Sequence, residues 1–204
     1  MEEVLDVYAE AYDPKRPQVC FDERPVQLLG DIYAPIPMQT GQARRYDYEY
    51  ERGGTANLFM MVQPLAGWRM VKTTQQRTKR DFAACMKDLV DVHFPDADVI
   101  RVVLDNLNTH TPSSLYEAFE PQEARRILRK LEFHYTPKHG SWLNMAEIEI
   151  SVLSRQCLQQ RLASISELEC QVSAWTTQRN AQALKIKWCF NLDTARTKLA
   201  RLYP

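Results

Sequence analysis

The first half of the chain alternates hydrophobic and polar residues with a period of two. Val19 to Asp22 and Tyr46 to Glu51 both show this alternation, which is typical of strands with one buried face. Two further runs follow, over residues 56–65 and 68–73, each preceded by a glycine-containing turn sequence. The pattern predicts an antiparallel meander whose first turn is Gly53-Gly54.

In the second half, helical and strand patterns follow one another. Residues 78–94 have apolar side chains at helical spacing, which predicts an amphipathic helix packed on the meander. The β-branched and aliphatic run Val99 to Leu104 predicts a buried central strand. The remaining expected elements are a helical stretch over 112–130 interrupted at Pro121, a short strand over 131–135, a loop over 136–141, and helices from 142, over 166–183 and over 194–202.

A meander followed by helix, strand, helix, strand and helix is the element order of a ribonuclease H-like fold. We therefore predict an α/β protein, with a mixed sheet flanked by helices and with one domain over residues 17–204. Residues 1–16 are weakly helical and end at Asp13-Pro14. This segment is predicted to be a linker or the tail of a preceding region.

Composition excludes several classes of protein. The 204 residues are 45% hydrophobic and 25% charged, which is enough for one real core and is not the bias of a disordered chain. No apolar run approaches the roughly 18 residues that would span a bilayer, and the chain begins with acidic residues. A cytoplasmic protein without membrane contact is expected. Five scattered cysteines with no C-x-x-C pair indicate neither a disulfide nor a zinc ribbon.

The net charge of zero combines two unequal parts. Residues 1–60 hold 11 acidic and 6 basic residues, whereas the remainder holds 15 acidic and 20 basic residues. This positive tilt is mild, because a protein that binds DNA on its own usually has a clearly basic face. If the chain acts on DNA, its own affinity should be modest.

Acidic residues at the ends of predicted strands are the candidate catalytic and metal-binding residues. Asp105 directly follows the buried run that ends at Leu104, and open α/β sheets place ligands at such carboxyl ends. Asp105 is interpreted as a metal-binding catalytic carboxylate, with a turn cap as the alternative. Asp22 and Glu23 are adjacent and must point to opposite faces of their strand, so pattern alone makes them equal candidates.

Two further acids, Glu147 and Glu149, stand near the beginning of the helix expected from Trp142. Glu147 and Glu149 each lie about 80° from the centre of its apolar stripe, on opposite flanks. Periodicity does not choose between them.

Three blocks of sequence resemble transposases of the insertion sequence 630 family, in the mariner superfamily of DDE enzymes. They are Val19-Cys20-Phe21-Asp22-Glu23, then Leu104-Asp105-Asn106 with His110, and Tyr135-Thr136-Pro137-Lys138-His139-Gly140-Ser141-Trp142-Leu143-Asn144-Met145-Ala146-Glu147. The resemblance implies that Asp22, Asp105 and Glu147 are the catalytic and metal-binding acids. It selects Asp22 over Glu23, and it selects Glu147 over Glu149, which is then expected to be a solvated residue.

The resemblance also implies a cofactor and supporting residues. Two Mg²⁺ ions, for which Mn²⁺ can substitute, would serve phosphodiester chemistry between carboxylates. Asn106 and His110 would support Asp105 or the substrate, and Lys138 and His139 would contact phosphates. The Pro-containing connection over residues 31–45, which includes Arg44 and Arg45, is expected to contact DNA and to clamp a partner subunit.

The function implied is metal-dependent DNA cleavage at transposon ends followed by strand transfer into target DNA. The expected enzyme is a DDE transposase, a polynucleotidyl transferase with endonuclease activity, that works as a homodimer on DNA. Relatives carry helix-turn-helix domains ahead of this region, so residues 1–16 would be the tail of such a region. The alternative is a catalytically inactive remnant that serves as a DNA-binding or dimerisation module.

Overall fold

One mixed five-stranded sheet organises the computed structural model, which describes residues 1–200. The strand order is β3-β2-β1-β4-β5. β1, β2 and β3 pair antiparallel, while β4 and β5 continue the sheet parallel to β1. Their bounds are Gln18–Asp31, Tyr50–Gln63, Trp68–Thr74, Ile100–Leu104 and Leu131–Tyr135. An antiparallel meander is present, although its strands are not divided as predicted, and the predicted parallel central strand is confirmed.

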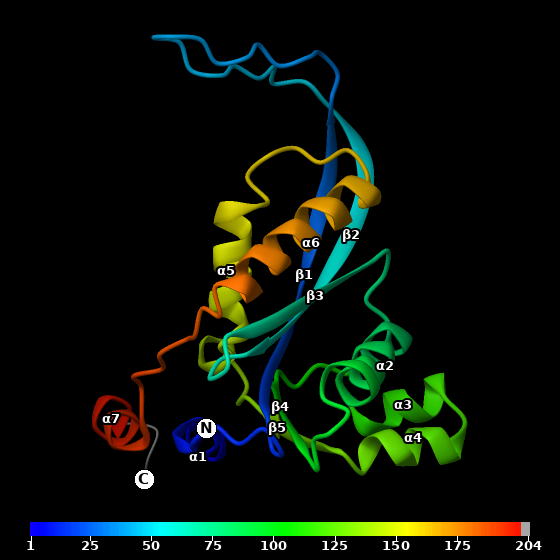
Figure 1. The fold of residues 1–204 in the computed structure, drawn as a ribbon, viewed down its shortest axis with the longest axis vertical. Coiled ribbons are helices and arrows are strands. Elements are labelled where there is room, and N and C mark those ends of the chain that lie inside the picture. The colour runs from blue at the N-terminus through cyan, green and yellow to red at the C-terminus, as the bar shows by residue number, and fades with distance from the viewer. Residues whose placement is uncertain (201–204) are drawn as a thin grey trace.

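Helices cover both faces of the sheet (Figure 1). On one face lie α2 (Lys79–Asp88), its π-helical continuation η1 (Leu89–His93), α3 (Pro112–Ala118) and α4 (Pro121–Leu128). The other face carries α5 (Ala146–Gln156), α6 (Ile165–Ala181), α1 (Glu2–Ala9) and α7 (Leu192–Lys198). We call these the α2 face and the α5 face. Within residues 1–200, no helix is both long and apolar enough to cross a membrane.

Alternate residues of β1 point into the two cores. Cys20 packs in the core of the α5 face, whereas Val19 and Phe21 pack in the core of the α2 face. Because side chains alternate along a strand, Asp22 belongs to the α5 face and Glu23 to the α2 face. These two neighbouring acids therefore meet different surroundings.

Local sequence signals explain where the helices begin. Thr78 and Asp81 form a reciprocal capping box at the start of α2. Pro112 and Pro121 stand in the first turns of α3 and α4, where a missing backbone N–H costs nothing. The helix predicted over 78–94 and the interruption predicted at Pro121 are therefore confirmed.

The prediction of a turn at Gly53-Gly54 is wrong, because both glycines lie inside β2. The β1–β2 register shifts between Leu28 and Leu29, opposite this glycine pair. Gly54 has φ +99°, and a Cβ on Gly53 would lie 2.4 Å from the carbonyl oxygen of Ala163. The glycines accommodate a bulge and a close chain approach. The predicted strands over 46–51 and 56–65 are therefore parts of one strand, β2, which begins only at Tyr50, and the first strand of the meander is β1.

Residues 32–49 form an arm that projects beyond the sheet between β1 and β2 (Figure 1). Isolated bridges at Ile36–Arg45 and Gln39–Gln42 hold its two limbs together. At its base, Arg161 donates hydrogen bonds to the Asp31 carboxylate at 2.8 Å and to the Glu49 carbonyl at 2.9 Å. The arm is thus a paired structure and not a shapeless loop.

Residues 2–9, within the segment predicted to be a linker or the tail of a preceding region, are packed on the sheet. These residues form α1, and its Val4, Leu5, Val7 and Tyr8 are buried in the core of the α5 face. The Tyr8 hydroxyl donates a hydrogen bond to the Leu143 carbonyl at 2.8 Å. A weak helical pattern is sufficient to form α1, because the apolar side of this helix is buried against the core of the α5 face.

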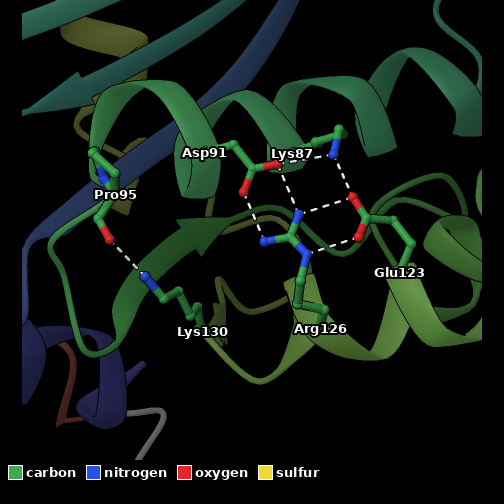
Figure 2. Close-up of polar contacts among 6 residues, drawn as sticks. All are labelled: Lys87, Asp91, Pro95, Glu123, Arg126 and Lys130. Carbon is green, nitrogen blue, oxygen red and sulfur yellow. Dashed lines mark hydrogen bonds and ion pairs between the residues drawn. The ribbon is translucent and has the colours of Figure 1, made fainter.

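A surface ion-pair network joins the end of α2 and η1 to α4 (Figure 2). Arg126 donates hydrogen bonds to both oxygens of Asp91, at 2.8 and 2.7 Å, and to Glu123 at 2.7 Å. Lys87 bridges the same two acids. The hydrogen bonds from Arg126 lower the pKa of Asp91 and of Glu123, each to about 2.

Candidate active site

Parallel pairing of β1 with β4 brings two acids to the same place. Cys20 pairs with Val103, and Asp22 and Asp105 each follow two residues later. Asp22 is 8% exposed, while the Asp105 side chain is 29% exposed. The first turn of α5 supplies Glu147, which is exposed.

The electrostatics of Asp22 reflect the acids around it. Burial raises the pKa of Asp22 to about 7. A hydrogen bond from the Glu23 backbone N–H opposes this increase, and the negative charges of Glu147, Asp105 and Glu23 add to it. All the side chains that shift this pKa are acids. The pKa of Asp22 thus responds to the charges of Asp105 and Glu147, and no basic side chain within residues 1–200 lowers it.

Asn144 ties β1 to the start of α5. Its side-chain amide donates to the Phe21 carbonyl at 2.8 Å and lies 3.3 Å from Asp22 Oδ2. Its carbonyl oxygen accepts from the Ala146 backbone N–H at 3.1 Å. Asn144 was not assigned a role from the sequence, although it belongs to the Leu143-Asn144-x-x-Glu147 pattern that pointed to Glu147.

Glu149 is not the solvated residue that was expected. Its side chain is 2% exposed and lies 3.3 Å from Arg69 Nε and 2.8 Å from Arg179 Nη2. Arg69 comes from β3 and is itself fully buried, and Arg179 comes from α6. The helical wheel could not show this, because the two arginines arrive from elements distant in sequence. Glu149 is thus paired with two arginines, whereas Glu147 is exposed and its charge raises the pKa of Asp22.

Arg69 is anchored by the backbone around it. It donates hydrogen bonds to the carbonyls of Gly67 at 3.1 Å, Arg179 at 3.0 Å and Leu184 at 2.5 Å. Sequence reasoning missed this buried arginine. Its only local signal is its place in a strand between half-buried neighbours.

His110 lies between two carboxylates on the α2 face. Its Nδ1 is 2.5 Å from Asp105 Oδ1, and its Nε2 is 3.0 Å from Glu23 Oε2. Burial by itself would lower the pKa of His110, but the hydrogen bonds to Asp105 and Glu23 outweigh it and raise this pKa to about 9. The ring is therefore charged at neutral pH. Its Nδ1 is hydrogen-bonded to Asp105, whereas the contact of Nε2 with Glu23 is an ion pair. Within residues 1–200, these three are the one group of acids and histidines close enough to hold an ion together.

Asp105 opens on a pocket of about 330 Å³ that is also lined by Asn106, Lys138 and His139. These three side chains are exposed. His139 adopts φ +63°, and a Cβ on Gly140 would lie 2.6 Å from the Pro137 ring, so the loop is tightly folded. The structure thus brings these predicted supporting residues to the side of Asp105.

The donor set suits a hard divalent cation. Asp22, Asp105 and Glu147 offer carboxylate oxygens, which Mg²⁺ and Mn²⁺ prefer. The mutual repulsion at Asp22 is what a bound cation would relieve. The donor chemistry of these three residues therefore fits the metal that the resemblance implied, whereas the ligand atoms that already lie within 4.8 Å of one another are those of Glu23, Asp105 and His110.

Comparison with known proteins places the chain in a family. The family model for the DDE superfamily endonuclease matches residues 17–169, most of the chain. The chain belongs to the DDE superfamily endonuclease family. No curated protein sequence matches it.

Solved transposase structures share the fold of this DDE family member. The Mos1 transposase paired-end complex with the left transposon end has a TM-score of 0.56 at 13% identity, covering 90% of this chain and 57% of that one. The Mos1 strand transfer complex has a TM-score of 0.58 at 12% identity, covering 89% and 54%. The chain spans little more than half the length of these proteins. The predicted ribonuclease H-like fold is confirmed.

Two predicted residues of this DDE domain do not join the acids. Arg44 and Arg45 lie on the arm, beyond the far end of β1. Asp31, at the base of the arm, lies nine positions after Asp22, which is roughly 30 Å along an extended strand. Arg44 lies over the Tyr46 ring at 4.7 Å. Any contact that these arginines make with a partner is remote from the acid group.

Proposed function

We propose that this chain is the catalytic domain of a mariner-like transposase of the insertion sequence 630 family. It hydrolyses DNA at transposon ends and then joins the freed 3′-hydroxyl to a phosphorus of target DNA. The observation that supports this proposal is that Asp22 is buried beside Asn144 at the start of α5, where the charges of Glu147 and Asp105 raise its pKa and no basic side chain within residues 1–200 lowers it. Family membership supports the endonuclease chemistry.

In this proposal, Asp22, Asp105 and Glu147 hold two Mg²⁺ ions, for which Mn²⁺ can substitute. Such ions neutralise charge on the attacking and leaving oxygens of an in-line displacement. The protein's own part is to fix the three carboxylates. Asp22 and Asp105 each lie two residues beyond the Cys20–Val103 pair of β1 and β4, and Asn144 joins Asp22 to the helix that carries Glu147.

Residues around the pocket beside Asp105 would handle the substrate. Lys138 and His139 are proposed to contact phosphates, because both are exposed in the pocket that Asp105 lines. Asn106 would orient Asp105 or water near it. DNA ends and target DNA are the proposed partners.

The test is a strand-transfer assay with pre-cleaved transposon ends. We expect product with Mg²⁺ or Mn²⁺ and none with EDTA. Asp105→Asn should reduce the rate by more than the roughly 10- to 100-fold that loss of an outer residue of a metal site costs. Glu169→Gln, an exposed acid on α6, is the matched control and should keep full activity.

A structural measurement supports the assay. Crystals soaked in Mn²⁺ should show anomalous density between Asp22 and Asp105, and this density should be lost in Asp105→Asn. A wild-type chain that binds end DNA but shows neither metal density nor cleavage would instead be an inactive, DNA-binding or dimerising remnant.

We also propose that the arm clamps a second subunit in a homodimer on DNA. The arm carries exposed apolar side chains, among them Ile36 at 57%, Met38 at 76% and Tyr48 at 85%. Deleting residues 34–43 should reduce the size of the complex with DNA while the melting temperature changes little. An unchanged complex size, measured by light scattering, would contradict the clamp.

A further inference from the structure

Glu23 is a buried acid that the proposed chemistry leaves without a task. Its side chain is 3% exposed and lies on the α2 face, opposite Asp22. A buried carboxylate is costly unless it is paired. Arg77 approaches only to 3.8 Å from a side chain that is 58% exposed, whereas His110 Nε2 lies at 3.0 Å. His110 is therefore the main partner of Glu23.

The His110 ring is held in one orientation. Its side chain is buried, and the rings of Phe21 and Phe82 pack against it with centroids 5.2 and 5.0 Å away. The Tyr135 hydroxyl donates to the His110 carbonyl at 2.8 Å. Its Nδ1 then meets Asp105 Oδ1 at 2.5 Å. A ring held this way can transmit a contact at one nitrogen to the group bound at the other.

The geometry points to Glu23 as a positioning residue that holds His110, so that His110 fixes one carboxylate oxygen of Asp105. The other oxygen of Asp105 stays available for a ligand. This inference rests on the proposed function, because the orientation of Asp105 matters to the reaction only if Asp105 binds the metal. Outer partners that orient a ligand in this way commonly tune metal affinity.

The alternation of β1 excludes Glu23 from the group around Asp22. Adjacent strand residues face opposite sides, and Asn144, which lies 3.3 Å from Asp22 Oδ2, belongs to the α5 face. The two neighbouring acids therefore have different relations to the site. The pKa of Asp22 responds to the charges of Glu147 and Asp105, whereas Glu23 contacts His110, which in turn is hydrogen-bonded to Asp105.

The test measures Mn²⁺ affinity of the full chain by the electron paramagnetic resonance signal of free Mn²⁺, together with kcat and KM for end DNA. Glu23→Gln should weaken Mn²⁺ binding about 10- to 100-fold. It should lower kcat while KM for DNA stays unchanged, since no DNA contact is altered. Glu169→Gln is the control for the loss of one acid and should change none of these values.

A double-mutant cycle separates positioning from direct binding. If Glu23 acts through His110, His110→Gln should cause a similar loss, and the double variant should lose little more than the larger single loss. Losses that multiply in the double variant would make Glu23 an independent metal ligand and would overturn the inference.

Glu23→Asp keeps the charge but shortens the side chain away from His110, and it should also weaken Mn²⁺ binding. If circular dichroism shows that Glu23→Gln does not fold, the Glu23→Asp variant is measured in its place. Full Mn²⁺ affinity in the folded Glu23 variants, beside lost affinity in Asp105→Asn, would overturn the positioning role alone. Unchanged affinity in Asp105→Asn would instead contradict the proposed function.

Discussion

Two acids on the same helix, Glu147 and Glu149, have opposite surroundings. Glu149 is buried and is paired with Arg69 and Arg179. Glu147 is exposed, and its charge adds to that of Asp105 at the buried Asp22. A compensated buried charge holds elements together, whereas acids gathered without compensation indicate a site that binds something positive.

The position of α5 is fixed by side-chain contacts of Glu149 and of Asn144. Glu149 draws β3 and α6 to the helix through the two arginines, and Asn144 joins its beginning to β1. The same turn of helix thus carries its structural contacts on one side and the candidate ligand on the other. Substitutions on the two sides should therefore have separable effects.

The largest effect on stability is expected from Arg69→Met. It removes one charge from the buried network and leaves Glu149 with only part of its compensation, which should cost about 3–5 kcal/mol of the free energy of unfolding. Urea denaturation measures this loss. Glu147→Gln is the matched change on the same helix and should cost far less. Equal losses in the two variants would contradict the distinction.

The second-largest effect on stability is expected from a divalent metal bound at Asp22, Asp105 and Glu147. At a Mg²⁺ or Mn²⁺ concentration of 100 times Kd, binding to the folded state adds about 2.7 kcal/mol. Thermal melts with and without the metal should show this gain in the wild type and in Glu169→Gln. The gain should be lost in Asp105→Asn, and a gain of the same size there would place the metal elsewhere.

Without metal, Asp22 should weaken the fold as the pH rises. Its pKa is raised from 3.8 to about 7, so the folded state binds the proton more tightly than the unfolded state. The penalty is absent below about pH 4 and complete above about pH 7. In EDTA at pH 8, Asp22→Asn should therefore be more stable than the wild type by roughly 1–3 kcal/mol. The two melting temperatures should converge at pH 4; a constant difference would contradict the linkage.

The smallest effect is expected from Arg126→Met, in the surface network of Figure 2. The folded-state pKa values of Asp91 and Glu123 are lowered to about 2. Their contribution is therefore present above about pH 4 and is lost as the pH falls toward 2. Exposed pairs are weak and screened by salt. The melting-temperature difference from wild type should be small at pH 7 and should vanish in 1 M NaCl.

Most of the fold could be predicted because its signals are local. The period-two pattern at Val19 to Asp22, the capping box at Thr78 and the prolines that open α3 and α4 each act within a few residues. The errors came from contacts between distant segments. The glycine pair Gly53-Gly54 predicted a turn because the sequence does not reveal the close approach of Ala163. The packing of residues 2–9 on the core likewise depends on segments that are distant in sequence.

For the candidate site, the sequence by itself determined which acids were available and that Asp105 would stand at a strand end. It also determined that Asp22 and Glu23 face opposite sides, because the strand period is two. Only the tertiary structure decided their partners. Arg69 and Arg179 reach Glu149 from β3 and α6, and His110 joins Glu23 to Asp105 across two strands. Charges in a folded protein interact through space, so the environment of each acid depends on residues that no local pattern connects.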